Sequence, residues 1–186
     1  MKTLTTLLLL ILSLNSFSQI QKEQWMIGGN ATFSFSQSEE LKMSTIQFSP
    51  SGGYFFSNKL AGGMRVNFGS ETYDWTDHKY RYSNISIAPF LRYYFLPAEQ
   101  KVNLFADAAY GFAWYKSKEV ISSRSHTYRF NTMSIIAGPA IFINKHTALE
   151  VTFGYTHLTR GPVDSTATNK LQVGIGLQIH LGKQKD

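Results

Sequence analysis

Four charged residues, two of each sign, lie within segments that otherwise have the pattern of strands. Arg65, Arg92, Asp107 and Glu150 each fall near the middle of such a segment, on its small and polar side. Isolated charges taken out of water are unstable, so two arginines and two carboxylates are expected to form ion pairs. Arginine suits this role because its planar fork can hold two carboxylates at once. The chemistry predicted for this set, which His180 could join, is structural ion pairing inside a narrow lumen.

Other arrangements that carry catalysis or hold cofactors are missing from the sequence. There is no cysteine, which excludes disulfides, thiolate zinc sites and iron–sulfur clusters. The sequence has no glycine-rich phosphate loop with a following lysine, no His-x-x-x-His pair and no Gly-x-Ser-x-Gly elbow. The histidines are scattered with no spacing that favours metal ligation. We therefore expect no cofactor, no metal site and no enzymatic activity.

The composition is that of a folded chain with few charges. Of 186 residues, 43% are hydrophobic and 16% are charged, and the usual charged share is about 25%. This apolar content excludes intrinsic disorder. The formal net charge is +6 without a dense basic run, which is typical of a mildly basic membrane or surface protein and excludes nucleic acid as a partner.

Residues 1–18 have the pattern of a secretory signal peptide. Lys2 precedes a leucine-rich apolar run, and Ser16 and Ser18 flank Phe17 in a small-x-small cleavage pattern. The run is shorter than the roughly 20 apolar residues of a membrane-spanning helix. The sequence therefore predicts a cleaved signal peptide over 1–18 and an exported domain over 19–186.

Apolar and small polar residues alternate with a period of two in eight segments of the exported domain. This is the period of a β-strand, whose side chains point alternately to its two faces. The eight segments are residues 25–35, 46–56, 60–68, 85–95, 102–114, 133–143, 149–157 and 171–181. The connections alternate between short (57–59, 96–101, 144–146) and long (37–44, 70–80, 116–127, 158–168). This alternation predicts an up-and-down meander in which all hairpins are aligned.

The polar face of these segments is also small, being rich in glycine, serine, threonine, asparagine and alanine. A face in contact with bulk water would carry many lysines and glutamates, so we expect it to line a lumen while the apolar face meets lipid. A lipid-exposed sheet edge would leave backbone groups without partners, so the sheet must close. The predicted fold is an all-β, eight-stranded antiparallel up-and-down transmembrane β-barrel.

Aromatic and proline residues add detail to this prediction. Aromatic residues near both ends of the apolar faces, such as Tyr54 and Trp114, fit the two interfacial girdles of a membrane barrel. Pro50, Pro89 and Pro139 fall on lipid-facing positions within strands. Because proline cannot donate a hydrogen bond to a neighbouring strand, each one predicts a bulge or a local break in the ladder.

Taken together, these features resemble the small outer-membrane β-barrels of the OmpA-like and OmpX-like kind, over essentially all of the chain after residue 18. The Phe17-Ser18-Gln19 junction is similar to signal-peptide ends of Bacteroidota envelope proteins. The resemblance implies a monomeric, porin-family-like protein of the outer membrane with a structural or surface-interaction role. Its implied partners are outer-membrane lipids, lipopolysaccharide and an extracellular ligand of the long loops. The last strand ends on Leu181, where such barrels often end on an aromatic residue.

Two further expectations concern the lumen and the third long loop. Eight strands leave an interior only just wide enough for side chains, and the four charged residues would obstruct it further, so little or no conductance is expected. Lys116, Lys118, Arg124 and Arg129 in or beside the third long loop could meet lipopolysaccharide phosphates.

Two alternative functions come from other classes. His157-Leu158-Thr159 resembles the His-x-Ser region of outer-membrane lipid A deacylases, which would make the protein an acyl hydrolase. Thr159 stands in the place of the serine, however, and only Asp164 is a candidate acidic partner. The other alternative is an exported, soluble, lipocalin-like carrier, which would not depend on detergent for solubility.

The alternation of connection lengths predicts the orientation of the barrel. Short turns face the periplasm and long loops face the outside in outer-membrane barrels. We expect a protease site inserted at Asp77 to be cleaved in intact cells, and one inserted at Asn144 to be cleaved only after the outer membrane is opened. Cleavage of the Asn144 insertion alone in intact cells would reverse the orientation.

Overall fold

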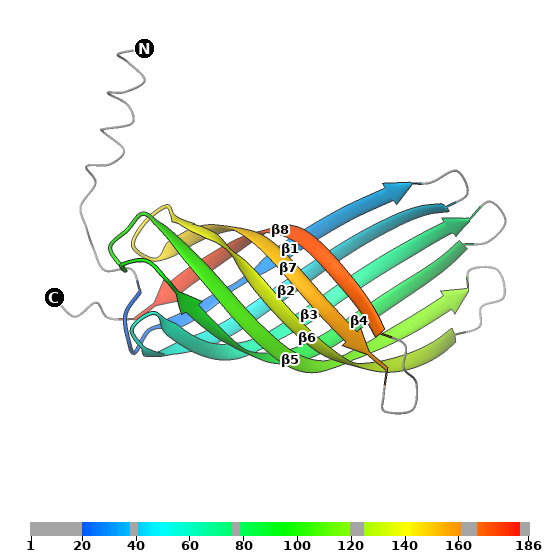
Figure 1. Cartoon of the computed structure of the whole chain (residues 1–186), viewed down its shortest axis with the longest axis horizontal. Coiled ribbons are helices and arrows are strands. Elements are labelled where there is room, and N and C mark those ends of the chain that lie inside the picture. The colour runs from blue at the N-terminus through cyan, green and yellow to red at the C-terminus, as the bar shows by residue number, and fades with distance from the viewer. Residues whose placement is uncertain (1–19, 38–40, 76–78, 120–124, 161–166, 183–186) are drawn as a thin grey trace, which may run out of the picture.

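The computed structural model describes residues 20–37, 41–75, 79–119, 125–160 and 167–182. The predicted signal peptide, Arg124 and Asp164 therefore lie outside the described residues, as does Asp77. Eight antiparallel strands close into one barrel in which each strand pairs with its neighbours in sequence and β8 pairs with β1 (Figure 1). The strands are β1 (Trp25–Gln37), β2 (Leu41–Ser57), β3 (Leu60–Trp75), β4 (Lys79–Tyr94), β5 (Val102–Glu119), β6 (Ser125–Phe142), β7 (Thr147–Thr159) and β8 (Ala167–Leu181).

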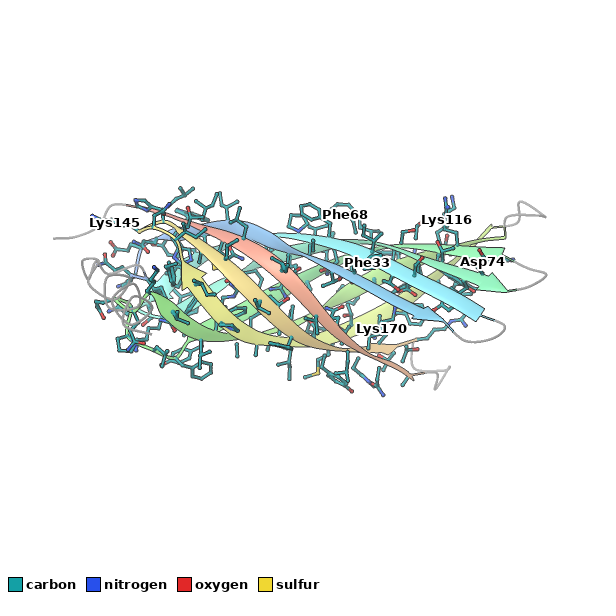
Figure 2. All side chains as sticks on the ribbon, turned by 90° about the horizontal axis from the view of Figure 1, so that it is seen from above. Phe33, Phe68, Asp74, Lys116, Lys145 and Lys170 are labelled. Atoms are coloured by element: carbon teal, nitrogen blue, oxygen red, sulfur yellow. The ribbon has the colours of Figure 1, made fainter. Side chains whose placement is uncertain are left out.

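The predicted barrel and its two faces are confirmed. Outward positions carry large exposed apolar side chains along every strand, such as Phe33, Phe112 and Ile175, while inward positions are buried or partly buried. Within the described residues, no helix is long and apolar enough to cross a bilayer. We call the end with the short connections after β2, β4 and β6 the turn end, and the opposite end the loop end. Figure 2 shows Lys145 at the turn end, and Asp74, Lys116 and Lys170 toward the loop end.

The strands extend further toward the loop end than the alternation of apolar residues predicts. β5 and β6 continue through much of the segment 116–127 that was expected to be a loop, and β3 and β4 do the same over 70–80. Aromatic side chains hold these extensions together across the strands. The rings of Tyr73 and Tyr82 are 5.4 Å apart, and those of Tyr115 and Phe130 are 5.2 Å apart. Such cross-strand pairs stabilise a sheet without an apolar outer face.

Each of the three strand prolines interrupts only one of the two ladders beside it. Pro50 pairs with Gly29 of β1, whereas the β2–β3 ladder skips from Phe48 to Ser51. Likewise, Pro89 interrupts only the ladder between β4 and β5, and Pro139 interrupts only the ladder between β6 and β7. In all three places the register is the same before and after the proline. The predicted local break is therefore confirmed, but no bulge forms, because the neighbouring strand keeps its alignment on both sides.

Two of these interruptions lie beside a glycine. Gly111 of β5 lies in the unpaired stretch opposite Pro89, and Gly138 of β6 directly precedes Pro139. A Cβ atom at these positions would collide with the backbone carbonyl oxygens of Ile87 and Val151. The glycines therefore allow neighbouring backbones to approach closely where the proline has removed hydrogen bonds.

The turn end of the lumen is packed with apolar and aromatic side chains. Phe55, Tyr94, Phe105 and Phe142 are fully buried there, together with His180. The Asn103 side chain ties the β4–β5 turn down through hydrogen bonds to the backbone of Leu96 and Pro97. The segment before β1 also packs against this end, since Ile20 is buried in the same cluster. This packed layer forms the base on which the charged residues of the lumen lie.

Candidate functional site

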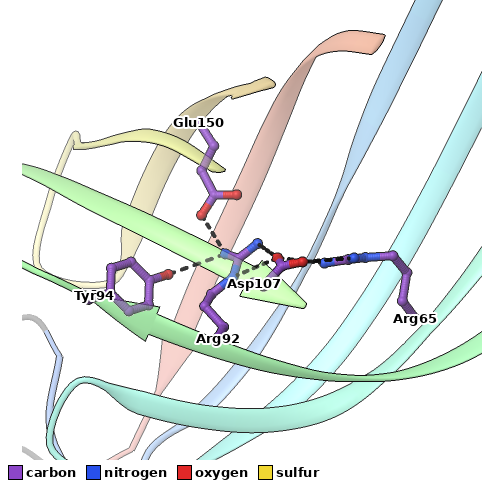
Figure 3. Close-up of polar contacts among 5 residues, drawn as sticks. All are labelled: Arg65, Arg92, Tyr94, Asp107 and Glu150. Atoms are coloured by element: carbon purple, nitrogen blue, oxygen red, sulfur yellow. Dashed lines mark hydrogen bonds and ion pairs between the residues drawn. The ribbon is translucent and has the colours of Figure 1, made fainter. Parts of the chain in front are cut away.

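The structure brings the four predicted lumen charges together in one connected network (Figure 3). Asp107 of β5 accepts two hydrogen bonds from Arg65 of β3, with N–O distances of 3.1 and 2.8 Å. Asp107 Oδ2 also accepts from Nε and Nη2 of Arg92, at 3.2 and 2.9 Å. The Nη1 atom of Arg92 donates to Glu150 Oε1 of β7 across the lumen, at 2.7 Å. Arg92 thus holds both carboxylates, as its planar fork allows.

The strand register explains why these residues meet. Arg92 and Asp107 are directly opposite one another in the β4–β5 ladder, so their side chains leave adjacent strands at the same height. Arg65 and Glu150 come from strands further around the wall. The barrel is narrow enough for long side chains from these strands to reach the same centre. Pairing on one polar face was predictable, whereas the contact of Arg92 with two carboxylates depends on the stagger between strands.

Aromatic groups complete the network, although the sequence analysis assigned them no role in it. The Tyr94 hydroxyl lies 3.3 Å from Arg92 Nη1. The guanidinium carbons of Arg92 and Arg65 lie 4.1 Å from the ring centre of Phe105 and 4.9 Å from that of Phe90. Phe90 and Tyr94 flank Arg92 at two-residue spacing, so strand parity alone could have placed all three on one face. His180 lies nearby, against the rings of Phe55, Tyr94 and Phe142.

The network is electrically balanced and shielded from water. Two arginines face two carboxylates, and the side chains are at most 4% exposed. In such surroundings ion pairs persist only with good geometry and extra hydrogen bonds, and loss of one partner leaves an uncompensated buried charge. The arrangement therefore forms a fixed polar layer across the lumen, which we call the plug, and its stability depends on all of its members.

A cavity of about 930 Å³ lies on the loop side of this plug. Arg65 contributes to its lining, and most other lumen-facing residues around it are uncharged amides and hydroxyls, including Gln47, Asn67 and Ser86. Asn67 donates to Ser86 at 2.6 Å. Towards the loop end the lumen carries an ion pair between Lys170 and Glu71 and a group of aromatic residues. These residues are Tyr73, Tyr82, Tyr115, Tyr128 and Phe130, and they line a second hollow of about 560 Å³.

The candidate hydrolase motif lies on β7 near the loop end. His157 Nδ1 is 2.7 Å from Asn169 Oδ1 of β8, and the Tyr155 hydroxyl donates to the same oxygen at 2.8 Å. Among the described residues no hydrogen bond joins His157 to Thr159, and Asp164 lies outside them. A hydroxyl nucleophile needs a base within hydrogen-bond reach, so the part of the motif that the structure describes lacks the contact that would activate Thr159.

Basic residues are exposed on the outer wall near the loop end. Lys116 of β5 and Arg129 of β6 point outward at the loop-end edge of the apolar belt. Arg129 lies directly opposite Trp114, and Lys116 is the next outward residue of β5 toward the loop end. Arg81 of β4 is exposed close by, opposite Lys118 in the ladder. Within the described part of the chain, no three histidine or acidic side chains gather in a way that could hold a metal ion.

Removing one member of the charge network should destabilise the barrel. We expect Asp107→Ala to lower the free energy of unfolding in lipid vesicles by about 3–5 kcal/mol, because two buried guanidinium groups lose their carboxylate. Arg65→Ala should have a smaller effect, since Asp107 keeps Arg92. In the double variant the two losses should fall short of their sum by about 0.5–3 kcal/mol.

Two exposed charges at opposite ends of the barrel provide the control. Glu99→Ala and Arg81→Ala should each change the unfolding free energy by less than about 0.5 kcal/mol and should add. Strict additivity of Arg65→Ala and Asp107→Ala would mean that these residues do not form the buried pair.

Comparisons with known proteins identify relatives of this fold. The family model described as "Outer membrane protein beta-barrel domain" matches residues 4–178. Among solved structures, OprG from Pseudomonas aeruginosa has 11% sequence identity and a TM-score of 0.59, covering 89% of this chain and 99% of its own. The N-terminal barrel domain of OprF from the same organism has 11% identity and a TM-score of 0.55, covering 86% and 98%.

A third structure is Ail, the attachment invasion locus protein of Yersinia pestis, in complex with the heparin analogue sucrose octasulfate. It has 14% identity and a TM-score of 0.50, covering 86% of this chain and 100% of its own. No curated protein matches the chain. At these identities the solved structures establish the shared fold. The family model spans nearly all of the closed barrel, so the chain belongs to the outer membrane protein beta-barrel domain family.

Proposed function

We propose that this outer-membrane barrel is a non-conducting, monomeric protein with a structural and surface-interaction role. It would be exported by the signal peptide over 1–18 and would have no enzymatic activity. The observation that carries the proposal is the buried network of Arg65, Arg92, Asp107 and Glu150, which crosses the lumen from β3 to β7. Ions passing through the barrel would have to displace paired side chains, of which Arg92 and Asp107 each make several hydrogen bonds.

The packing beneath the network supports a closed lumen. The aromatic side chains at the turn end fill the space between the network and the turns, and Phe55 and Phe142 are at most 2% exposed. The cavity therefore lies on the loop side alone. The strands continue past the apolar belt toward the loop end, which supports a role in presenting the long loops to the outside.

Planar-bilayer recording tests the closed lumen directly. The unmodified protein should give no steady conductance, because the network and the aromatic layer leave no continuous water path. The variant that combines Arg92→Ala with Glu150→Ala keeps the network neutral while removing its cross-lumen bridge. This variant should conduct measurably more than the parent. A large, steady, ohmic conductance of the unmodified barrel would contradict the proposal.

The outward basic residues favour lipopolysaccharide as a partner. Lys116 and Arg129 lie on neighbouring strands at the outer edge of the apolar belt, where lipid phosphates would lie in the predicted orientation. Charge-assisted hydrogen bonds to phosphate are strong and suit lysine and arginine. Ail binds a polysulfated sugar in its solved complex, so an anionic saccharide partner has a parallel on the same fold. For this chain, the proposal of a lipopolysaccharide partner rests on the positions of Lys116 and Arg129.

Charge removal on the outer wall should weaken binding to lipopolysaccharide. We expect Lys116→Ser with Arg129→Ser to reduce the affinity of the barrel for lipopolysaccharide micelles at low salt several-fold, since exposed ion pairs contribute up to about 1 kcal/mol each. Lys59→Ser with Lys145→Ser removes the same charge at the turn end and should leave the affinity unchanged. Equal losses in both double variants would show that only net charge matters.

A further inference from the structure

The seam where the barrel closes is incomplete near the loop end. The β1–β8 ladder runs from Trp25 opposite Leu181 to Thr32 opposite Gly174 and stops there. Both strands continue beyond this point, β1 to Gln37 and β8 back to Ala167. Figures 1 and 2 both show the loop-end parts of β1 and β8 diverging from each other.

The gap is not caused by fraying of the two strands. Over the same stretch β1 remains paired with β2 as far as Gln37 opposite Lys42. β8 remains paired with β7 as far as Ala167 opposite Thr159. The two hairpins are therefore intact and separate only from each other. Residues 33–37 of β1 do not pair with residues 167–173 of β8.

Side chains along the margins of the gap are unusually open. Leu171 is 85% exposed, which is more than any other exposed large apolar side chain among the described residues, and Phe33 is 69% exposed. Leu171 belongs to the outward apolar row of β8 that runs to Leu181, so the gap reaches into the lipid-facing belt. Unpaired backbone at membrane depth is tolerated only where it is buried in protein or lines a water-filled cavity.

The lumen cavity of about 930 Å³ reaches this gap. Its lining includes Thr32 and Phe33 on one margin and Gln172 and Val173 on the other. In a membrane the cavity would therefore open to lipid on one side, through a slot flanked by apolar side chains, while its interior is polar. This combination suits a molecule with a polar head and an apolar tail.

The lining also indicates the kind of head group. Lys170 pairs with Glu71, and Arg65 pairs with Asp107, so the charges around the cavity balance. Amide and hydroxyl groups make up much of the remaining polar lining, such as Asn67 and Ser134. They can both donate and accept hydrogen bonds, and this matches a head group that is itself rich in hydroxyls or amides. Among the described residues that line the cavity, a charged head group would find no unpaired charge of the opposite sign.

We propose that the loop-side cavity binds a single-chain amphiphile with an uncharged, hydroxyl- or amide-bearing head. The head occupies the polar cavity, and the alkyl chain passes between β1 and β8 into the outer part of the membrane. The bound chain covers the apolar margins of the gap around Phe33 and Leu171. This site is separate from the charge network, which forms its floor.

Disulfide formation tests whether the gap exists in a membrane. Phe33→Cys with Val173→Cys would face each other if the ladder continued, and Ala31→Cys with Ile175→Cys is the control pair on the paired part of the seam. The chain has no other cysteine. In nanodiscs of palmitoyl-oleoyl-phosphatidylcholine with an oxidant, the control pair should bridge and the gap pair should not, because bridging needs Cα atoms closer than about 7 Å.

Two results of this experiment would overturn the proposal. Equally fast bridging of both pairs within one chain would show that the seam is closed. Bridging of the gap pair between two chains would show that a second copy covers the open edges.

Binding is tested with dodecyl maltoside, which has an uncharged polyol head and one alkyl chain. The reporter is Ser134→Cys in the cavity lining, and Ser83→Cys on the exposed outer wall is its control. In the same nanodiscs, dodecyl maltoside should slow modification of Ser134→Cys by a water-soluble thiol reagent at least fivefold. Modification of Ser83→Cys should be unchanged.

Two comparison compounds separate the contribution of the head group to binding from that of the alkyl chain. Maltose lacks the chain, and dodecyltrimethylammonium carries a charged head on the same chain, so neither should protect Ser134→Cys. Equal protection by all three, protection by maltose alone, or no protection by dodecyl maltoside would overturn the proposal. A Ser134→Cys thiol that fails to react in the free barrel would contradict an accessible cavity and would also overturn it.

Discussion

A strand that crosses a membrane must satisfy its backbone hydrogen bonds within the protein, because the hydrocarbon offers no partners. That constraint explains most of this molecule. It requires the sheet to close, and closure with eight strands makes the lumen narrow. It also explains the placement of the prolines, each of which removes hydrogen bonds from one ladder while the ladder on its other side holds the strand in register. The loop-end part of the β1–β8 seam departs from this rule, and there the open edges border the lumen cavity.

The narrow lumen in turn determines how charge can be accommodated. No bulk water separates side chains that project from opposite walls, so Arg65, Arg92, Asp107 and Glu150 are stable only as a neutral, fully paired set. The aromatic layer at the turn end excludes water from one side of this set, and the polar cavity lies on the other. The barrel is thus divided along its axis into an apolar base, a charged plug and a polar chamber. The chamber is the part suited to ligands.

Much of this organisation could be predicted because a period of two places every residue of a strand on one of two faces. Parity alone placed the four charges in the lumen and the large apolar residues against lipid. Properties that depend on the stagger between strands could not be predicted. The contact of Arg92 with two carboxylates, the pairing of His157 with Asn169 and the early end of the β1–β8 ladder all belong to this class. The strand extensions beyond the belt were missed because they lack an apolar face, although Tyr73, Tyr82, Tyr115 and Phe130 signalled them.

The two lumen arginines are held by carboxylates within a closed barrel, and this pairing should make both guanidinium groups rigid. Nitrogen-15 NMR of the arginine side chains, recorded on the protein in lipid nanodiscs, tests it most directly. Arg65 and Arg92 should each show separate, slowly exchanging Nη resonances, because hydrogen bonds to Asp107 and Glu150 prevent rotation of the guanidinium groups. Asp107→Asn should release Arg65 while Arg92 remains held by Glu150. Averaged, rapidly exchanging Nη signals from both arginines in the unmodified protein would show that neither guanidinium group is held.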